Sequence, residues 1–264
     1  MNHTSRFAMI PCALLAGAFA LAGCRVEVTG PKRYDGTPKT TSAAWTTTKI
    51  VTIDNGNGSL TVDTAGTTSD VSVTGAPFAL EPDDDQGKQT AVNEMTNKLV
   101  LAATADSTGN VTVSGNGTGT YGFDMTVHLP SNFDGPLSIT EGNGPITVAG
   151  SAISPSTTIT GSAGDITVQN IANSVVIKNG AGDITVSARP AGAGNSIRTD
   201  VGDINATIAG DVTITAKTEF GGTVTPPPGA AANLSADKMS AAITLGAGTG
   251  ALDVSTGNGN VIFQ

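Results

Sequence analysis

The sequence predicts an all-β fold, and within that class a parallel β-solenoid (β-helix-like) of roughly 18–20-residue coils that is less regular at its N-terminal end. The pentapeptide GDITV occurs at 164–168 and 182–186, and the variants GPITV and GDINA occupy 144–148 and 202–206. Apolar and polar residues alternate around these repeats, as in strands with one buried face. A fixed period with two β segments per unit indicates coils that stack on one another.

The composition fits this class and excludes others. Charged residues make up 13% of the 264 residues and aromatic residues 4%, whereas 34 residues are glycine. A helical bundle would be richer in Glu, Lys, Leu and Arg, and a disordered chain would hold fewer apolar residues than the 38% found here. The formal net charge of −9 opposes binding to nucleic acid, which depends on neutralising phosphates.

Residues 1–23 have the pattern of a signal peptide. Arg6 precedes a largely apolar stretch from Phe7 to Gly23, which is too short to span a membrane. The stretch leads into LAGC at 21–24, which resembles the lipobox of bacterial lipoproteins. This resemblance implies that Cys24 is acylated and becomes the first residue of the mature chain. A plain signal peptide with an incidental cysteine is the alternative.

Acylation at Cys24 would make the membrane a partner of the protein through its N-terminal lipid. Each buried methylene contributes about 0.8 kcal/mol, and more than one acyl chain gives stable anchoring. Residue 25 is Arg rather than Asp, which by resemblance to Gram-negative lipoproteins implies an extracytoplasmic location at the outer membrane or cell surface. Cys12 lies in the removed segment, so no disulfide is expected in the mature protein.

The rest of the chain divides into a tether and a domain. Residues 24–44 contain scattered Gly, Pro, Thr and Lys, and they predict a lipidated N-terminus and a flexible tether. Residues 45–264 predict the β-domain, in which 75–97 is expected to be an inserted loop. Over 45–130 the period is lost, and an antiparallel sandwich is the alternative there.

Alignment of the repeats on their glycines predicts three interior columns of branched side chains. Like packs on like, because strands of successive coils lie about 4.8 Å apart. The columns contain Ile139, Ile159, Ile177 and Ile197; Ile146, Ile166, Ile184 and Ile204; and Val148, Val168, Val186 and Ala206. The glycine of each coil is expected to turn the corner at positive φ.

The C-terminal part fits the same frame less closely. Gly259 lies 57 residues after Gly202, which predicts three coils over that interval, two of them weak. The proline-rich segment 223–234 predicts a loop outside the stack. The final residues, NVIFQ, predict a strand whose outer edge is unpaired.

The stretch FDMTVHLPSNFDGPLSITEGNGPITVAG at 123–150, followed by the GDITV units, resembles the putative-adhesin domain of bacterial envelope lipoproteins. The likeness covers roughly 45–264 and is strongest over 121–208. It implies a parallel β-solenoid in the cell envelope. The family's adhesin label brings no established ligand.

Two columns of charged residues are the candidates for chemistry. Asp165, Asp183 and Asp203 occupy equivalent places in successive coils and would lie about 5 Å apart. We expect each to accept backbone N–H bonds in its turn; a bound Ca²⁺, which takes six to eight oxygen ligands, is the alternative. Lys178 and Arg198 form the second column. We expect no cofactor and no catalysis, because the sequence holds no nucleophile motif, phosphate loop or zinc-ligand spacing.

The sequence therefore predicts a lipid-anchored envelope protein that displays a repetitive surface for adhesin-like binding, with surface glycans or proteins as partners. One alternative is a structural spacer or assembly factor of the envelope without a ligand. Another is a carbohydrate-active β-helix enzyme, which would use Lys178, Arg198, Asp183 and Asp203.

Overall fold

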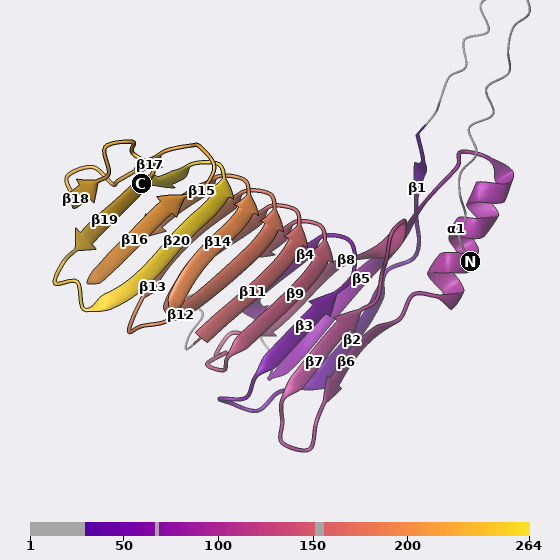
Figure 1. Ribbon diagram of the computed structural model, residues 1–264. Coiled ribbons are helices and arrows are strands. Elements are labelled where there is room, and N and C mark those ends of the chain that lie inside the picture. The colour runs from indigo at the N-terminus through magenta and orange to yellow at the C-terminus, as the bar shows by residue number, and fades with distance from the viewer. Residues whose placement is uncertain (1–29, 67–68, 151–155) are drawn as a thin grey trace, which may run out of the picture. The chain divides into compact units, whose positions relative to one another are not determined.

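Strands occupy most of the protein, as its β-branched, alternating sequence predicts. The computed structural model describes residues 30–66, 69–150 and 156–264 (Figure 1). Within these ranges 21 strands belong to one mixed sheet, and one helix, α1 (Asp85–Asn97), accompanies them. The all-β class is confirmed.

The sheet consists of two ladders that share the long strand β12 (Ile166–Ala181). The first ladder begins with two strands that both pair with β5 and then continues in spatial order: β1 (Lys32–Asp35) and β2 (Lys39–Ala44), β5 (Asp70–Glu81), β8 (Tyr121–Pro130), β4 (Leu60–Gly66), β10 (Ile146–Val148), β12, β13 (Ile184–Pro190), β15 (Ile204–Ile208), β21 (Val261–Phe263) and β17 (Val224–Thr225).

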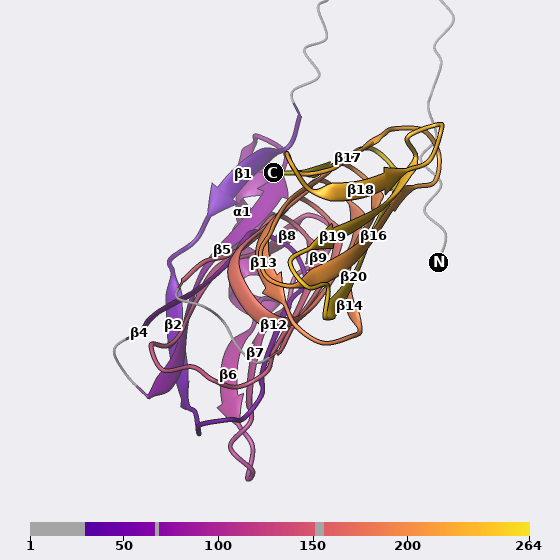
Figure 2. The ribbon, with the colours of Figure 1, turned by 90° about the vertical axis from the view of Figure 1, so that its left-hand side faces the viewer.

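The second ladder runs alongside the first, and one strand from each ladder makes up a coil (Figure 2). In spatial order it contains β6 (Leu101–Ala105), β7 (Val111–Gly115), β3 (Val51–Asn55), β9 (Leu137–Asn143), β11 (Ser156–Ala163), β12, β14 (Asn195–Val201), β20 (Gly250–Asn258), β16 (Val212–Thr218), β19 (Ser240–Leu245) and β18 (Ala231–Leu234). Inward side chains of both ladders form one apolar core.

The three predicted columns lie in this core in the predicted register. Ile139 pairs with Ile159, Ile159 with Ile177, and Ile177 with Ile197, all in parallel strands. The columns beginning at Ile146 and Val148 are aligned in the same way. Branched side chains suit these positions because they pack against like neighbours on a pleated surface.

The corner glycines explain why the pentapeptide repeats. Gly164, Gly182 and Gly202 have φ of 126°, 123° and 137°, so the predicted positive φ is confirmed. A Cβ on Gly182 would lie 2.3 Å from the carbonyl oxygen of Gly164, and one on Gly202 would lie 2.2 Å from that of Gly182. Only glycine allows successive coils to approach this closely at the corner.

The order of coils in space differs from the order in sequence at both ends of the stack. The coil of β3 and β4 lies between β7–β8 and β9–β10. The last coil, β20 and β21, lies directly on β14 and β15 and separates them from β16 and β17. The prediction of three successive coils between Gly202 and Gly259 is therefore wrong: the segment between these two glycines contains a coil, β16 and β17, that stacks beyond the last one.

Antiparallel strands occupy both ends of the stack. At one end β5 pairs antiparallel with β8, and β6 with β7. At the other end β19 pairs antiparallel with β16 and β18. The final strand, predicted to have an open edge, is internal, since β21 pairs with both β15 and β17. Part of the predicted loop 223–234 also joins the sheet, as β17 and β18.

Two further predictions near the N-terminal end are corrected. The expected inserted loop at 75–97 contains the end of β5 and the whole of α1, whose N-cap Asp84 accepts a hydrogen bond from the Gly87 amide at 2.6 Å. Residues 32–44, expected in a flexible tether, form β1 and β2 against β5. Hydrogen bonds to an existing strand explain why these polar segments are ordered.

Candidate binding face

Each carboxylate of the Asp165, Asp183 and Asp203 column binds the backbone of the next coil. Asp165 Oδ1 accepts the Asp183 amide at 2.9 Å, and Asp183 Oδ1 accepts the Asp203 amide at 2.8 Å. Asp203 Oδ1 accepts the amide of Asn260 at 2.7 Å, in the coil that stacks on it in space. The predicted turn role is thus present, but the N–H groups come from neighbouring coils rather than from each residue's own turn.

The same arrangement continues in the coils beyond the three aspartates. Asn260 Oδ1 accepts the Thr223 amide at 3.0 Å, and Asp124 Oδ1 accepts the Ser59 amide at 2.9 Å. Burial would raise the pKa of Asp124, but hydrogen bonds from Ser59 and the ion pair with Arg33 outweigh it and lower that pKa. The corresponding position in the coil that lies between Ser59 and Asp165 is Pro145, which has no N–H to donate.

The three aspartates of this column do not form a metal-binding cluster. Over residues 30–66, 69–150 and 156–264, no three His, Cys, Asp or Glu side chains lie close enough to hold a metal ion together. One oxygen of each column carboxylate is also engaged by an amide. Cation binding at Asp165, Asp183 and Asp203 stays a prediction, and this geometry does not favour it.

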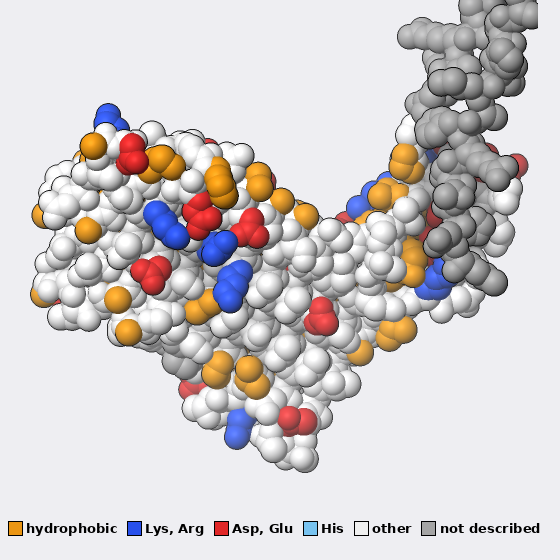
Figure 3. Space-filling model, in the orientation of Figure 1, with side chains coloured by type: hydrophobic (Ala, Val, Ile, Leu, Met, Phe, Trp, Pro, Cys, Tyr) orange, Lys and Arg blue, Asp and Glu red, His pale blue; other side chains and the backbone are white. Residues whose placement is uncertain are grey.

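The second predicted column forms a row of cations on the outer face of the second ladder. Lys178 on β12 lies in register with Arg198 on β14. Ser255 on β20 and Lys217 on β16 continue the row. Arg198 forms an ion pair with Asp200 at 3.1 Å, and Lys217 forms one with Glu219 at 3.1 Å. Figure 3 shows these blue and red side chains gathered over the second ladder.

A shallow hollow lies beside Lys178 and Arg198. Its volume is about 530 Å³, and its lining combines small residues with the charged pair: Gly161, Ser162, Lys178, Asn179, Gly180, Arg198 and Asp200. The glycines and the serine follow the outward Thr160 on β11 and the outward Lys178 on β12. Their small side chains leave room for the hollow. Within the described part of the chain, Lys178 has no carboxylate within 4.0 Å.

Glu141 is a buried acid that the sequence interpretation missed. It lies on β9 with a fully buried side chain, and neither carboxyl oxygen forms a hydrogen bond with any described residue. Burial raises the pKa of Glu141 to about 8; the nearby Asn55 side chain and Asn143 amide only partly oppose this. The alternation of Leu137, Ile139 and Glu141 along β9 could have shown that this acid points inward.

Residues at the same inward position as Glu141 in later coils donate hydrogen bonds to backbone carbonyl groups. Asn179 Nδ2 donates to the Gly164 oxygen at 2.8 Å, and Thr199 Oγ1 donates to the Gly182 oxygen at 3.1 Å. Thr256 Oγ1 continues the column. An ionised Glu141 has no proton to donate and would be a charge in an apolar core, which accounts for its preference for the neutral form.

His128 lies on the outer face of the first ladder between two polar neighbours. Its Nδ1 is 2.8 Å from Asp63 Oδ1, and Ser72 pairs with it across β5 and β8. This brings Ser, His and Asp onto adjacent strands, a juxtaposition the sequence did not reveal. No hydrogen bond joins Ser72 to His128 in the described ranges, so the row lacks the nucleophile–base contact of a hydrolase.

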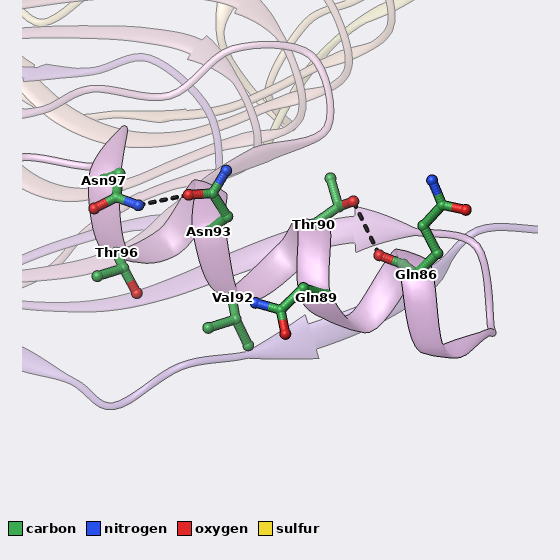
Figure 4. Close-up of a pocket in the computed structure, with 7 residues that line it drawn as sticks. All are labelled: Gln86, Gln89, Thr90, Val92, Asn93, Thr96 and Asn97. Carbon is green, nitrogen blue, oxygen red and sulfur yellow. Dashed lines mark hydrogen bonds between the residues drawn. The ribbon is translucent and has the colours of Figure 1, made fainter.

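A second hollow, on the outer side of α1, is lined by one helix alone. Its residues are Gln86, Gln89, Thr90, Val92, Asn93, Thr96 and Asn97. Figure 4 shows that two of its hydrogen bonds stay within the helix, from Thr90 to the Gln86 carbonyl and from Asn97 to Asn93. The hollow brings together no charged groups.

Cys24, the predicted lipidation site, and the signal peptide at 1–23 lie outside the described residues. Among the residues that are described, no helix is long and apolar enough to cross a membrane. The lipid anchor and the membrane as a partner therefore stay predictions.

The fold defines the protein as an all-β chain with a mixed, curled sheet. No family model matches the sequence, and no curated protein does either. Two solved structures match it at low similarity. One is a "putative cell adhesion protein" from Clostridium sporogenes, 12% identical, with a TM-score of 0.47 over 86% of this chain and 100% of that one. The other is a "putative adhesin" from Bacteroides fragilis, 9% identical, with a TM-score of 0.23 over 86% of this chain and 97% of that one.

Proposed function

We propose that this protein is a lipid-anchored β-solenoid of the cell envelope that binds a partner through the outer face of its second ladder. The observation that carries the proposal is the row of Lys178, Arg198 and Lys217 beside a hollow floored by small residues. The row presents a cation on three of four successive strands, with Ser255 between Arg198 and Lys217, which favours an extended ligand held by several weak contacts.

The solenoid interpretation has its support in the central coils. From β9 to β15 every pairing between successive coils is parallel, and like residues meet like. Antiparallel strands at both ends would then serve as caps, which block edge-to-edge association. A capped stack of this kind suits long-term exposure outside the cytoplasm.

We propose binding rather than catalysis for this face. The cations and acids of the second ladder are exposed, and the hollow beside them is open to solvent. Acid–base chemistry on a sugar instead uses carboxyl groups with tuned pKa values on either side of the scissile bond, in a site that excludes water.

The proposed anchor rests on LAGC at 21–24. Metabolic labelling with a palmitate analogue, followed by membrane fractionation, tests it. We expect label and membrane association in the wild type and neither in the C24A variant. A wild-type chain that is processed but carries no lipid would contradict the anchor and favour a plain signal peptide.

The proposed binding role is tested with purified residues 30–264 and whole bacterial or host cells. We expect saturable attachment that is lost when the outward residues of β12, β14 and β16 are exchanged for Thr while the inward columns are kept. Equal attachment of both proteins would contradict the proposal. Altered envelope integrity in a deletion strain with unchanged attachment would instead support a structural spacer, which the inter-coil hydrogen bonds of the aspartate column would stiffen.

A further inference from the structure

The hollow beside Lys178 has the features of a small anion subsite. Lys178 is exposed on its rim, without a carboxylate partner among the described residues, whereas Arg198 and Lys217 each have one. The local charges of the lining are therefore two cations and one anion, Asp200. This excess is local, because the acidic charge of the remaining domain is screened beyond about 8 Å at physiological ionic strength.

The spacing of the row favours a sugar chain over a peptide. Adjacent rungs of a β ladder lie about 4.8 Å apart, whereas same-face residues of an extended peptide repeat at about 6.7 Å. One pyranose ring in an extended polysaccharide is close in length to one rung. An acidic sugar polymer lying across the strands could therefore place successive rings over β12 and β14, where Lys178 and Arg198 pair in register.

The surroundings of the hollow offer contacts for the rest of a sugar ring. Hydroxyl groups can donate to the Asp200 carboxylate and exchange hydrogen bonds with Ser162. One residue further along the strands, Ala163, Ala181 and Val201 form a row in register, and Val201 is 53% exposed. The C–H face of a sugar can cover such an aliphatic row.

We propose that this hollow binds the carboxylate of a uronic-acid residue in an acidic polysaccharide, with Lys178 as the principal cation. Arg198 and Asp200 hold the neighbouring hydroxyl groups, and Gly161 and Gly180 are part of the lining. This inference rests on the proposed binding function and names the ligand class for it.

Calorimetric titration of residues 30–264 with tetragalacturonate tests the subsite. The expected result is saturable binding of the free acid and loss of binding to its methyl ester, which has the same backbone without the charge. K178A should weaken binding about tenfold or more, since a charge-assisted hydrogen bond is lost. S162W should also abolish binding, because it fills the hollow without changing the charge.

K88A is the matched control, because it removes one exposed cation on α1, outside the row and the hollow. Binding in K88A should stay within about twofold of wild type. Equal losses in K178A and K88A, unchanged binding in S162W, or equal binding of the acid and its ester would each overturn the subsite. Attachment to cells without any binding of tetragalacturonate would overturn this inference alone and leave the proposed function in place.

Discussion

At the scale of single residues, the corner glycines allow the backbones of successive coils to approach closely. Gly182 has positive φ, and the carbonyl group of the preceding coil occupies the space that a Cβ would need. Backbone at a positive φ of this size disfavours every residue with a side chain. The repeated glycine of GDITV is therefore a packing requirement of the stack.

G182A tests this requirement. We expect the free energy of unfolding to fall by at least about 2 kcal/mol, because strain at the backbone adds to a steric clash between coils. Urea denaturation measures it. G192A is the control: Gly192 also has positive φ, 72°, but a Cβ there would meet no atom within 4 Å. Equal losses in the two variants would show that coil contact contributes nothing.

The aspartate that follows the glycine acts as a hydrogen-bond acceptor between coils. D183A leaves the Asp203 amide without its side-chain acceptor, and we expect a loss of about 1 kcal/mol in unfolding free energy. D183N keeps an oxygen at the position and should lose less. D253A, which removes an exposed acid on the second ladder, should have little effect.

The cation alternative at the same column has a separate test. Thermal unfolding of the wild type with and without millimolar calcium gives the readout. A calcium-dependent rise in midpoint that D183N abolishes would support a cation site. An unchanged midpoint leaves the carboxylates with the inter-coil role alone.

Glu141 makes stability depend on pH. Its pKa in the folded protein, about 8, lies above the ordinary value of 4.5, so the folded state binds its proton more tightly than the unfolded chain. Between these values unfolding releases a proton, and the unfolding free energy should fall by up to about 1.4 kcal/mol per pH unit as pH rises. The contribution is fully present below pH 4.5 and lost above pH 8.

E141Q should remove this slope, because Gln is neutral at every pH and nearly the same size. Urea denaturation at a series of pH values from 5 to 9 measures the slope in both proteins. E219Q, which neutralises the exposed partner of Lys217, is the control and should leave the slope intact. A wild-type stability that does not vary over this range would mean that Glu141 is ionised in the fold.

At the scale of elements, the acidic run at 83–85 shows how local chemistry begins a helix. Asp83 pairs with Lys32 on β1, Asp84 caps α1, and Asp85 lies in its first turn. The sequence placed these residues in the expected inserted loop at 75–97. Burial of Ala91 and Met95 against the sheet completes the helix.

The cap predicts a difference between two adjacent aspartates. D84A removes the acceptor of the Gly87 amide and should lower the unfolding free energy by about 1 kcal/mol. D85A removes only a charge near the helix N-terminus and should cost less, about 0.5 kcal/mol. Hydrogen exchange in the first turn of α1 measures the effect locally; faster exchange in D85A than in D84A would contradict the assignment of the cap.

At the scale of the whole molecule, the last coil holds the C-terminal end of the stack together. The strands of this coil, β20 and β21, lie between the β14–β15 coil and the β16–β17 coil. A coil that ended the stack could be removed without opening the core, but this one cannot.

Deletion of residues 250–264 tests the internal position. We expect the truncated protein to lose cooperative unfolding and to aggregate, because Val212 and Ile214 on one side and Ile197 on the other lose the neighbours that bury them. Circular dichroism and size-exclusion chromatography give the readout. A monomeric truncation with a sharp transition would indicate that the remaining coils close on each other.

The sequence by itself determined the all-β class, the three interior columns and the corner glycines. These features depend on contacts between coils adjacent in both sequence and space, such as Ile159 with Ile177, so a period of 18–20 residues reveals them directly. It also placed Lys178 beside Arg198, because both belong to the regular part of the stack.

Only the tertiary structure decided the arrangement at the two ends and the environment of isolated side chains. Nothing local in the sequence states that β20 inserts beside β14, or that β1 and β2 pair with β5, because these pairings join segments far apart in the chain. The hollow at Ser162 and the neutral state of Glu141 likewise depend on which strands surround them. The pairing of strands far apart in the chain and the burial of each side chain determine these features. Neither can be read from the local pattern of apolar and polar residues.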